Sequence, residues 1–465
     1  MHKLFSGELK VINLGLPGFK QALDDAGAPA VQVDWRPPAV DGALLQRVKR
    51  RLPEIERANA KTMEIILGGL PRLVGMGRAL DVIPGMKPNL LLHAGPPITW
   101  SRMCGPMRGA VLGSLLYEGR ASSVEEAEQM AASGEIEFAP CHEHDAVGPM
   151  AGIVSASMPV FIVKNERYGN HAFCTMNEGL GKVLRYGAYG EAVIQRLKWM
   201  EGTLYPTLQR ALEKVGAIDL KNIIAQALHM GDEVHNRNRA ATSLFYRTIA
   251  PAIVTTCADG ATAAAVLEFI NHNDHFFLNL SMAASKATLD AARGIVHSSV
   301  VTVMSRNGTD FGVQLSGSGG KWFTGPADVP DALFFPGYSR ADANPDIGDS
   351  AITETNGLGG FAIAASPAIV QFVGGSTSDA IRYTQQMYEI TAAENNAYQV
   401  PYLNFRGTPT GIDVIKVVEK NIVPFIDTGV AHKEPGVGQI GAGVLNAPLA
   451  PFVEAFESFA QSLLS

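Results

Sequence analysis

The order of apolar and polar positions near the start of the chain predicts a strand, a tight turn, a helix and a second strand. Apolar residues dominate positions 10–14, a Gly-Leu-Pro-Gly turn occupies 15–18, residues 19–26 can form a short helix, and 30–35 have the composition of a strand. Asp34 ends that strand, where dinucleotide-binding folds place a ribose-binding carboxylate. The turn is G-x-x-G rather than G-x-G-x-x-G, so we expect a Rossmann-like arrangement without NAD.

The rest of the pattern divides the α/β chain into three predicted parts. Helical spacing at 44–67 and 101–117 flanks an apolar strand at 89–94, which completes a Rossmann-like domain over residues 1–134. Apolar residues then recur at helical spacing through 190–295, which predicts a helical insert. Strand-like runs at 299–304 and 311–315 indicate a mixed α+β domain formed by residues 135–189 and 296–465.

A compact polar run, Cys141-His142-Glu143-His144-Asp145, lies between two apolar stretches that resemble strands. Two imidazoles and two carboxylates at a strand edge can transfer protons, so His142, Glu143 and His144 are candidate catalytic residues. Histidines at a strand end that are satisfied by backbone partners would give the same pattern. Both interpretations stay open at this point.

Two further polar segments interrupt the helical insert, at 231–239 and 271–275. The first can be a solvated junction between helices. The second is followed at once by Phe276-Phe277-Leu278, so its amide and imidazole groups need internal partners or a ligand. From these segments we predict the catalytic residues His272 and His275 and the substrate-binding residues Asn236, Arg237, Arg239, Asn271 and Asn273.

Glycine-rich turns supply the candidate anion sites, because their backbone N–H groups can face a phosphate or carboxylate. The loop at 316–321 lacks the G-x-x-x-x-G-K-[ST] spacing of a P-loop, and the turn at 353–360 is equally compatible with close helix packing. The predicted anion-binding residues are Gly15, Gly18, Ser318, Gly319, Gly320, Gly357 and Gly359. Glu354 and Asn356 in the last turn are added as substrate-binding candidates.

Composition excludes several classes of partner. The chain has 465 residues, 46% of them hydrophobic and 18% charged, with a formal net charge of -7. No basic run exceeds Lys49-Arg50-Arg51, so no nucleic-acid partner is expected. No apolar run reaches the roughly 18 residues of a membrane span, and the four cysteines are far apart without a C-x-x-C pair. We therefore expect a cytoplasmic protein without disulfides.

Several longer blocks give the chain a family resemblance. The start VINLGLPGFKQAL with AVQVDWRPP, and the stretches CHEHDAVGPMAGIVSASMPVF, NHNDHFFLNLSMAASKA and ITETNGLGGFAIAASPAIV, resemble the bacterial YlbE/AllG-like family over nearly the whole chain. The resemblance implies a subunit of an oxamate carbamoyltransferase of anaerobic allantoin breakdown. It also implies an FdrA-like partner, a small third subunit and a carbamate kinase, and it leaves a homodimer open.

The predicted residues include the types that such a reaction needs. Transfer of a carbamoyl group from a ureido acid, such as oxalurate, onto phosphate requires hydrogen-bond donors that bind these two anions. It also requires stabilisation of the tetrahedral oxyanion and a proton for the leaving nitrogen. His142 or His144 can supply the proton, and Arg237 or Arg239 can hold a carboxylate. The oxyanion donors would be Asn271, His272, Asn273 and His275. The S-x-R-T-R phosphate signature of the aspartate and ornithine carbamoyltransferases is missing, so phosphate would bind at the glycine turns or in the partner subunit.

Two other classes of function compete with a carbamoyltransferase subunit. One is a metal-dependent amidohydrolase that uses His142, His144, His272 and His275, and the other is a non-catalytic scaffold subunit. The spacing of these histidines lacks an H-x-x-x-H or C-x-x-C element, so we expect neither a bound metal nor another cofactor.

Overall fold

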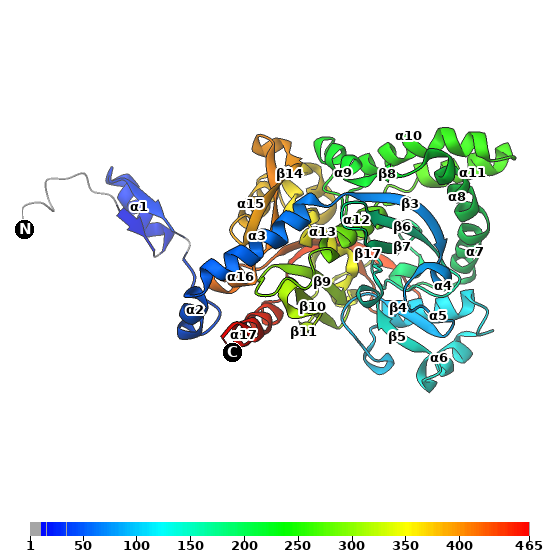
Figure 1. Cartoon of the computed structure of the whole chain (residues 1–465), viewed down its shortest axis with the longest axis horizontal. Coiled ribbons are helices and arrows are strands. Elements are labelled where there is room, and N and C mark those ends of the chain that lie inside the picture. Colours follow the sequence, from blue (N-terminus) through cyan, green and yellow to red (C-terminus); the bar gives the residue numbers. More distant parts are fainter. Residues whose placement is uncertain (1–10, 15, 34, 465) are drawn as a thin grey trace, which may run out of the picture.

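The computed structural model describes residues 11–14, 16–33 and 35–464. They form a mixed α/β structure in which helices surround several small sheets (Figure 1). The chain is thus α/β as predicted, but the sheets are short and mostly antiparallel. No helix in these described ranges is long and apolar enough to cross a membrane.

An antiparallel sheet with the order β7-β6-β3-β8 lies beside the longest run of helices. Its strands are β3 (Pro71–Arg78), β6 (Pro159–Asn165), β7 (His171–Thr175) and β8 (Ile218–Asp219). Helix α12 (Leu278–Asp290) packs on this sheet through β3, β6 and β7. Alanine and serine occupy many of its positions and nearly all of its side chains are buried, so it can approach neighbours closely on several sides.

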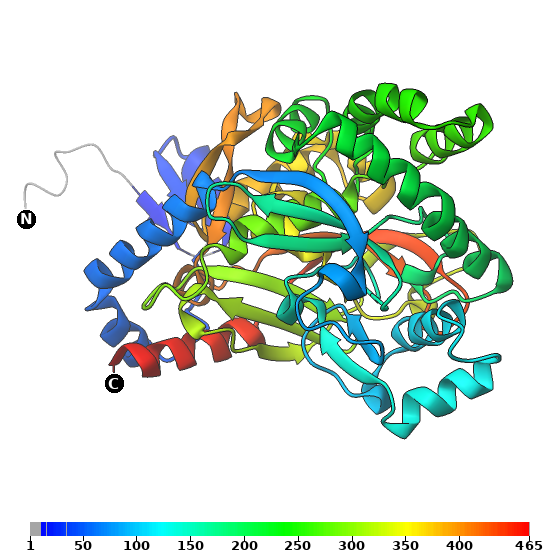
Figure 2. The same ribbon diagram turned by 45° about the vertical axis from the view of Figure 1, so that its right-hand side comes forward.

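Two more sheets form the other half of the molecule. One has the order β11-β10-β9-β13 and the other β12-β17-β16. Their strands are β9 (Val301–Asn307), β10 (Asp310–Leu315), β11 (Phe323–Pro326), β12 (Asp331–Phe334), β13 (Ile347–Gly348), β16 (Phe425–Ala431) and β17 (Gln439–Asn446). The C-terminal helix α17 (Ala450–Leu464) lies along β10 and β11 (Figure 2). A hairpin of β14 (Thr391–Val400) and β15 (Arg406–Ile412) is paired separately.

Helices fill the range predicted to be a helical insert. They are α7 (Glu191–Trp199), α8 (Tyr205–Val215), α9 (Leu220–His229), α10 (Arg239–Thr256) and α11 (Gly260–Asn271), followed by α12. Leu208, Phe245 and Ile249 are among the fully buried residues of these helices, as their apolar spacing indicates. Other helices of the main body are α2 (Gly42–Lys49), α3 (Leu52–Gly68), α4 (Ala79–Val82), α13 (Ile352–Thr355), α14 (Val370–Val373), α15 (Thr377–Met387) and α16 (Val414–Lys420).

The N-terminal segment forms the local β-α-β unit that the sequence indicates. Strands β1 (Val11–Asn13) and β2 (Ala30–Gln32) are parallel and helix α1 (Pro17–Asp25) connects them. The unit stands apart from the main body of the chain (Figure 1). Gly15 and Asp34, both named in the sequence-based predictions, lie outside the described residues.

The Rossmann-like arrangement predicted for residues 1–134 is not confirmed. Strand β4 (Leu90–His93) pairs in parallel with β5 (Glu137–Pro140) and makes one antiparallel bridge from Leu92 to Val154, and the helices α5 (Gly105–Tyr117) and α6 (Val124–Ser133) connect β4 to β5. The pair β1-β2 and the pair β4-β5 are separate sheets in the described part of the chain. Strands from all three predicted domain ranges pair in the sheet that contains β3, and the predicted domain boundaries stay a prediction.

Candidate functional site

Four segments that are distant in sequence meet between the helical part and the two C-terminal sheets. They are the loop 231–238 between α9 and α10, the loop 272–277 between α11 and α12, the turn 352–360 that begins with α13, and strand β16. Hydrogen bonds join them: the N–H of Gly359 donates to the carbonyl of Glu233 at 2.8 Å, and Ser281 of α12, the helix that follows the loop 272–277, donates to the carbonyl of Val234 at 3.0 Å. The predicted polar segments 231–239 and 271–275 therefore lie close together in the folded chain.

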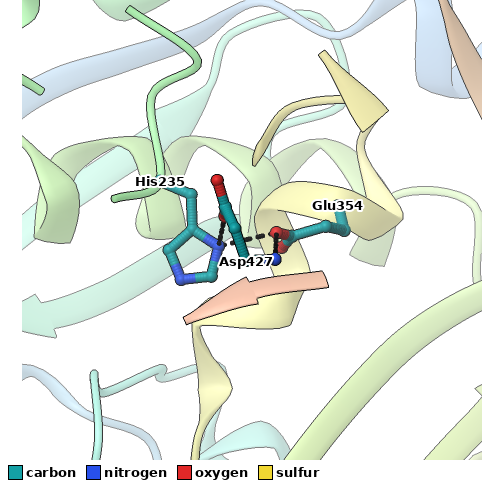
Figure 3. Close-up of side chains that lie close together, drawn as sticks. All are labelled: His235, Glu354 and Asp427. Atoms are coloured by element: carbon teal, nitrogen blue, oxygen red, sulfur yellow. Dashed lines mark hydrogen bonds and ion pairs between the residues drawn. The ribbon is translucent and has the colours of Figure 1, made fainter. Parts of the chain in front are cut away.

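The centre of this meeting point is a buried group made of His235, Glu354 and Asp427 (Figure 3). Nδ1 of His235 lies 2.7 Å from Oε1 of Glu354 and 3.1 Å from Oδ1 of Asp427. All three side chains are almost completely shielded from solvent. One donor atom from each residue lies within 4.8 Å of the other two, so this imidazole and these two carboxylates can together hold a metal ion.

The backbone around the group holds His235 and Glu354 in place. The carboxylate of Glu233 accepts the N–H of His235 at 2.6 Å and also the N–H of Arg237. Oε1 of Glu354 accepts the N–H of Gly360 at 3.0 Å, and Oε2 accepts the Thr353 hydroxyl at 3.0 Å. Because these bonds hold both the loop and the turn, the imidazole and the carboxylate have little freedom to move apart.

Two backbone positions have the left-handed conformation that this arrangement requires. Val234 has a φ of 66°, which is unusual for a β-branched residue and locates strain in the loop just before His235. Gly359 has a φ of 55°, and a Cβ atom there would lie 2.3 Å from Oε1 of Glu354. Position 359 therefore has to be glycine for the Glu354 carboxylate to stay where it is.

Burial and neighbouring charges have opposite effects on the pKa values of His235 and Glu354. Burial lowers the pKa of His235, but the Glu354 and Asp427 carboxylates outweigh it and raise that pKa to about 10. Burial raises the pKa of Asp427 to about 6. Burial also raises the pKa of Glu233, and the negative charge of Asp427 adds to this effect. For Glu354 the positive His235 overcomes burial and lowers the pKa.

A cavity of about 260 Å³ opens next to the buried group. Its lining includes Leu180, Asn236, Arg237, Asn238, Arg239, Asp274, His275, Ala368, Ile369 and Gln371. We call it the 236–275 cavity. Nδ2 of Asn236 and Nδ1 of His275 are buried and have no hydrogen-bond partner among the residues that the structure describes. Among the described residues, the two cationic side chains have long ion-pair distances, 3.5 Å from Arg237 to Asp232 and 3.8 Å from Arg239 to Asp274.

His275 is an uncharged imidazole. Burial, followed by the positive charges of Arg185 and His235, lowers its pKa to about 3. Asn273 fixes the loop around it: its Oδ1 accepts the N–H of His275 at 3.1 Å, and its Nδ2 donates to the carbonyl of Asn177 at 2.9 Å. At neutral pH the ring of His275 can thus offer an acceptor nitrogen next to the donor amide of Asn236.

The structure brings some of the predicted residues together and places others elsewhere. Asn236, Arg237, Arg239 and His275 line one cavity, Asn273 supports it, and Glu354 and Gly359 belong to the adjoining buried group. Asn271 is exposed at the end of α11, and the exposed side chain of His272 lies 4.0 Å from Glu268. Asn356 donates to the Ser285 hydroxyl at 3.2 Å, and Gly357 follows it in the left-handed conformation.

The polar run at 141–145 forms a short 3-10 turn in which neighbouring side chains have different surroundings. His142 is buried, with Nε2 3.4 Å from Asp349 and its ring edge-on to Trp322. Glu143 accepts the Trp322 indole N–H at 3.2 Å, and Nδ1 of His144 lies 2.7 Å from the carbonyl oxygen of Pro84. None of the described cavities is lined by these three residues, and their catalytic roles stay predictions.

The predicted anion-binding glycines are distributed over the chain. Ser318 lines a separate cavity of about 140 Å³ together with Lys321, and Gly319 and Gly320 continue that loop in the left-handed conformation. Gly18 lies in the first turn of α1, in the N-terminal unit. In the part of the chain that the structure describes, Gly18, Ser318, Gly319 and Gly320 do not line the 236–275 cavity with Arg237, so the predicted residues do not form one anion site.

Sequence reasoning missed two residues of the buried group. His235 lies inside a polar run that the sequence singles out, but only its neighbours were predicted to act. Asp427 stands alone in the apolar stretch Val-Pro-Phe-Ile-Asp-Thr-Gly-Val, where every residue of β16 is buried. A lone carboxylate inside a buried strand is the one signal that could have identified it.

The sequence is similar to one family model and to two Escherichia coli proteins. The family model described as oxamate carbamoyltransferase subunit AllG matches residues 136–350. Escherichia coli K12 has an uncharacterized protein YahG that is 47% identical over 458 residues, 97% of each chain. Its oxamate carbamoyltransferase subunit AllG is 46% identical over 412 residues, 88% of this chain and 98% of that one.

A solved structure supports the fold as well. The crystal structure of a conserved protein of unknown function from Enterococcus faecalis V583 superimposes with a TM-score of 0.87 and 48% sequence identity, covering 88% of this chain and 98% of that one. The family resemblance read from the sequence blocks is confirmed by the identity over almost the entire chain. The chain belongs to the AllG family.

Proposed function

We propose that the chain is a subunit of a carbamoyltransferase that binds a ureido acid in the 236–275 cavity and transfers its carbamoyl group to phosphate. The family supports a transferase subunit, since one relative is named as an oxamate carbamoyltransferase subunit. The observation that carries the substrate class is the polar lining of the cavity, in which cationic, donor and acceptor groups are adjacent.

Each polar group of a ureido acid has a matching charged or hydrogen-bonding group in the lining of the 236–275 cavity. A planar guanidinium from Arg237 or Arg239 matches the carboxylate. The free N–H of Asn236 Nδ2 can donate to a carbonyl oxygen. The uncharged ring of His275 can accept an N–H of the ureido group through Nδ1. A ligand that satisfies these buried groups would recover the free energy that their lack of partners costs.

The same groups suit the transition state of carbamoyl transfer. When a phosphate oxygen attacks the carbamoyl carbon, the carbamoyl oxygen becomes negative, and a donor such as Asn236 Nδ2 would stabilise that charge. The bond from carbon to the amide nitrogen then breaks, and this nitrogen takes up the proton that the attacking hydrogen phosphate gives up, which releases oxamate and carbamoyl phosphate from oxalurate. We assign phosphate binding to the interface with an FdrA-like subunit and a small third subunit. The loop that contains Ser318 lies at a separate cavity, and the N–H groups of Gly359 and Gly360 are already bound to Glu233 and Glu354.

Reconstitution tests this proposal. The chain together with its FdrA-like and small partner subunits should convert oxalurate to oxamate and carbamoyl phosphate only when phosphate is present. Phosphate is diagnostic, because a hydrolase would use water and turn over without it. Turnover of a ureido acid by the isolated chain in phosphate-free buffer, or no turnover by the complete set, would contradict the proposal.

A further inference from the structure

The buried group of His235, Glu354 and Asp427 carries more negative charge than its surroundings balance. Glu233 is also completely buried and accepts the backbone N–H of His235, so a third buried carboxylate lies next to this group. The positive charge of Arg306 acts on Glu354, but that guanidinium is bound to Asp346. A buried carboxylate without a cation or enough donors is costly, so the cluster needs a further positive partner.

Asp427 shows where such a partner is needed. Its side chain is fully buried, and neither oxygen accepts a hydrogen bond from any residue that the structure describes, although Oδ1 is 3.1 Å from the His235 ring nitrogen. Glu354, by contrast, has bonds from Gly360 and Thr353. One Asp427 oxygen faces the His235 ring nitrogen that also contacts Glu354 (Figure 3), so two buried carboxylates share one imidazole.

We propose that His235, Glu354 and Asp427 form a binding site for one divalent transition-metal ion, of the Mn²⁺ or Zn²⁺ class. One imidazole nitrogen and two carboxylate oxygens from separate segments converge within 4.8 Å, as three protein ligands of a catalytic metal do. The mixed nitrogen and oxygen donors favour these ions over Ca²⁺, which prefers oxygen alone, and over thiolate-bound ions. The ion would leave positions open for non-protein ligands.

Residues next to the three ligands fit this role. The Glu233 carboxylate accepts the backbone N–H of His235. It would position His235 without binding the ion itself. Asn236, next to His235 in sequence, lines the 236–275 cavity, so that cavity lies close to the proposed ligand. The sequence-based expectation of no metal rested on the spacing of other histidines. Spacing in the sequence does not identify the ligands proposed here, because Glu354 is 119 positions from His235 and 73 positions from Asp427.

Metal titration of the full-length chain tests the site without any assay of turnover. After treatment with chelator and removal of the chelator, the protein should bind one Mn²⁺ or Zn²⁺ by calorimetry, with a dissociation constant below about 10 µM. Asp427→Asn and Glu354→Gln should each weaken binding by at least about 100-fold. His229→Asn, which changes an exposed histidine of α9, should bind as the unaltered chain does.

A second measurement does not depend on the variants folding. Pulsed electron paramagnetic resonance of the Mn²⁺-loaded chain should show coupling to one imidazole nitrogen. Binding weaker than about 1 mM, no nitrogen coupling, or equal affinity in folded Asp427→Asn would overturn the metal site. These results are separate from the proposed function: a chain that binds no metal by these two measurements, but that turns over oxalurate in the reconstituted set, would refute the metal site and leave the transferase in place.

Discussion

Nδ1 of His235 lies 2.7 Å from Oε1 of Glu354, although the two residues are 119 positions apart in the chain. This contact joins the loop that precedes α10 to the short turn that contains α13. The turn also meets strand β16, since Gly360 approaches the backbone of Phe425 so closely that a Cβ atom would lie 2.4 Å from its carbonyl oxygen. The buried group is thus a junction of the helical part with the C-terminal sheets.

Gly359→Ala should disrupt that junction. The added Cβ would collide with the Glu354 carboxylate, and alanine disfavours the φ of 55° found there, so we expect a loss of about 1–3 kcal/mol in the free energy of unfolding. Gly202→Ala is the matched control, because nothing lies within 4 Å of its Cβ position in a helical segment. It should be neutral or stabilise by up to about 1 kcal/mol. Urea denaturation measures both, and equal stability of the two variants would contradict the packing argument.

Arg237→Met tests the substrate carboxylate. Loss of the planar fork should raise the KM for oxalurate by about 10–100-fold in the reconstituted set, with a smaller change in kcat. Arg247→Met removes an exposed guanidinium of α10 outside the cavity and should leave both constants unchanged. An unaltered KM in Arg237→Met, or an equal rise in both variants, would show that the carboxylate binds elsewhere.

Asp232 should make stability depend on pH. Burial raises its pKa to about 7, above the ordinary value of 3.8, so between these values the folded chain holds a proton that the unfolded chain releases. The free energy of unfolding should therefore fall as pH rises from about 4 to 7. In the unaltered chain the N–H of Ala241 donates to the Asp232 carboxylate at 2.9 Å. Asp232→Asn keeps an oxygen that can accept this bond, but its side chain cannot ionise.

Urea titrations at several pH values show this difference. Asp232→Asn should match the unaltered chain near pH 4 and exceed it by roughly 1–3 kcal/mol at pH 8. Asp81→Asn, an exposed change in α4, should follow the unaltered chain at both pH values. A constant difference between Asp232→Asn and the unaltered chain across the whole range would disprove the linkage.

Local patterns predicted those features that depend on neighbours in sequence. The β-α-β unit at the N-terminus follows from a turn signal between two apolar runs, and the polar segments at 231–239 and 271–275 were found because they interrupt helical spacing. The pairing of strands was not predictable in this way. A β-α-β pattern does not specify which other strands join a sheet, and β4 pairs with β5 instead of extending the N-terminal pair.

The site shows the same limit. His142, Glu143 and His144 are adjacent in sequence, but their turn ends at Asp145 with a φ of 54°, and the three side chains contact different partners. His235 and Asp427, by contrast, contact each other from segments that share no sequence signal. Adjacent polar residues therefore suggested one catalytic group, whereas the folded chain gathers another from long-range contacts.

The buried pair of Arg306 and Asp346 gives the last prediction. The guanidinium is fully buried, with Nε 2.5 Å and Nη2 3.0 Å from the Asp346 oxygens. It also donates to the carbonyl of Gly348 at 2.7 Å and to the hydroxyls of Ser350 and Thr428 at 3.4 and 3.1 Å. These contacts connect β9 and β13 to β16 one residue after Asp427, so Arg306 also positions that carboxylate.

Arg306→Met should cost about 3–5 kcal/mol in the free energy of unfolding, because Asp346 would remain buried without its cation. Arg306→Lys should recover part of that loss, since an ammonium restores the charge but lacks the five donors of the fork. The matched control is Arg102→Met, which removes an exposed partner of Asp310 and should cost at most about 1 kcal/mol. Chemical denaturation compares the three variants. If Arg306→Met proves as stable as Arg102→Met, the buried pair contributes little and Asp427 must be held in place by other contacts of β16.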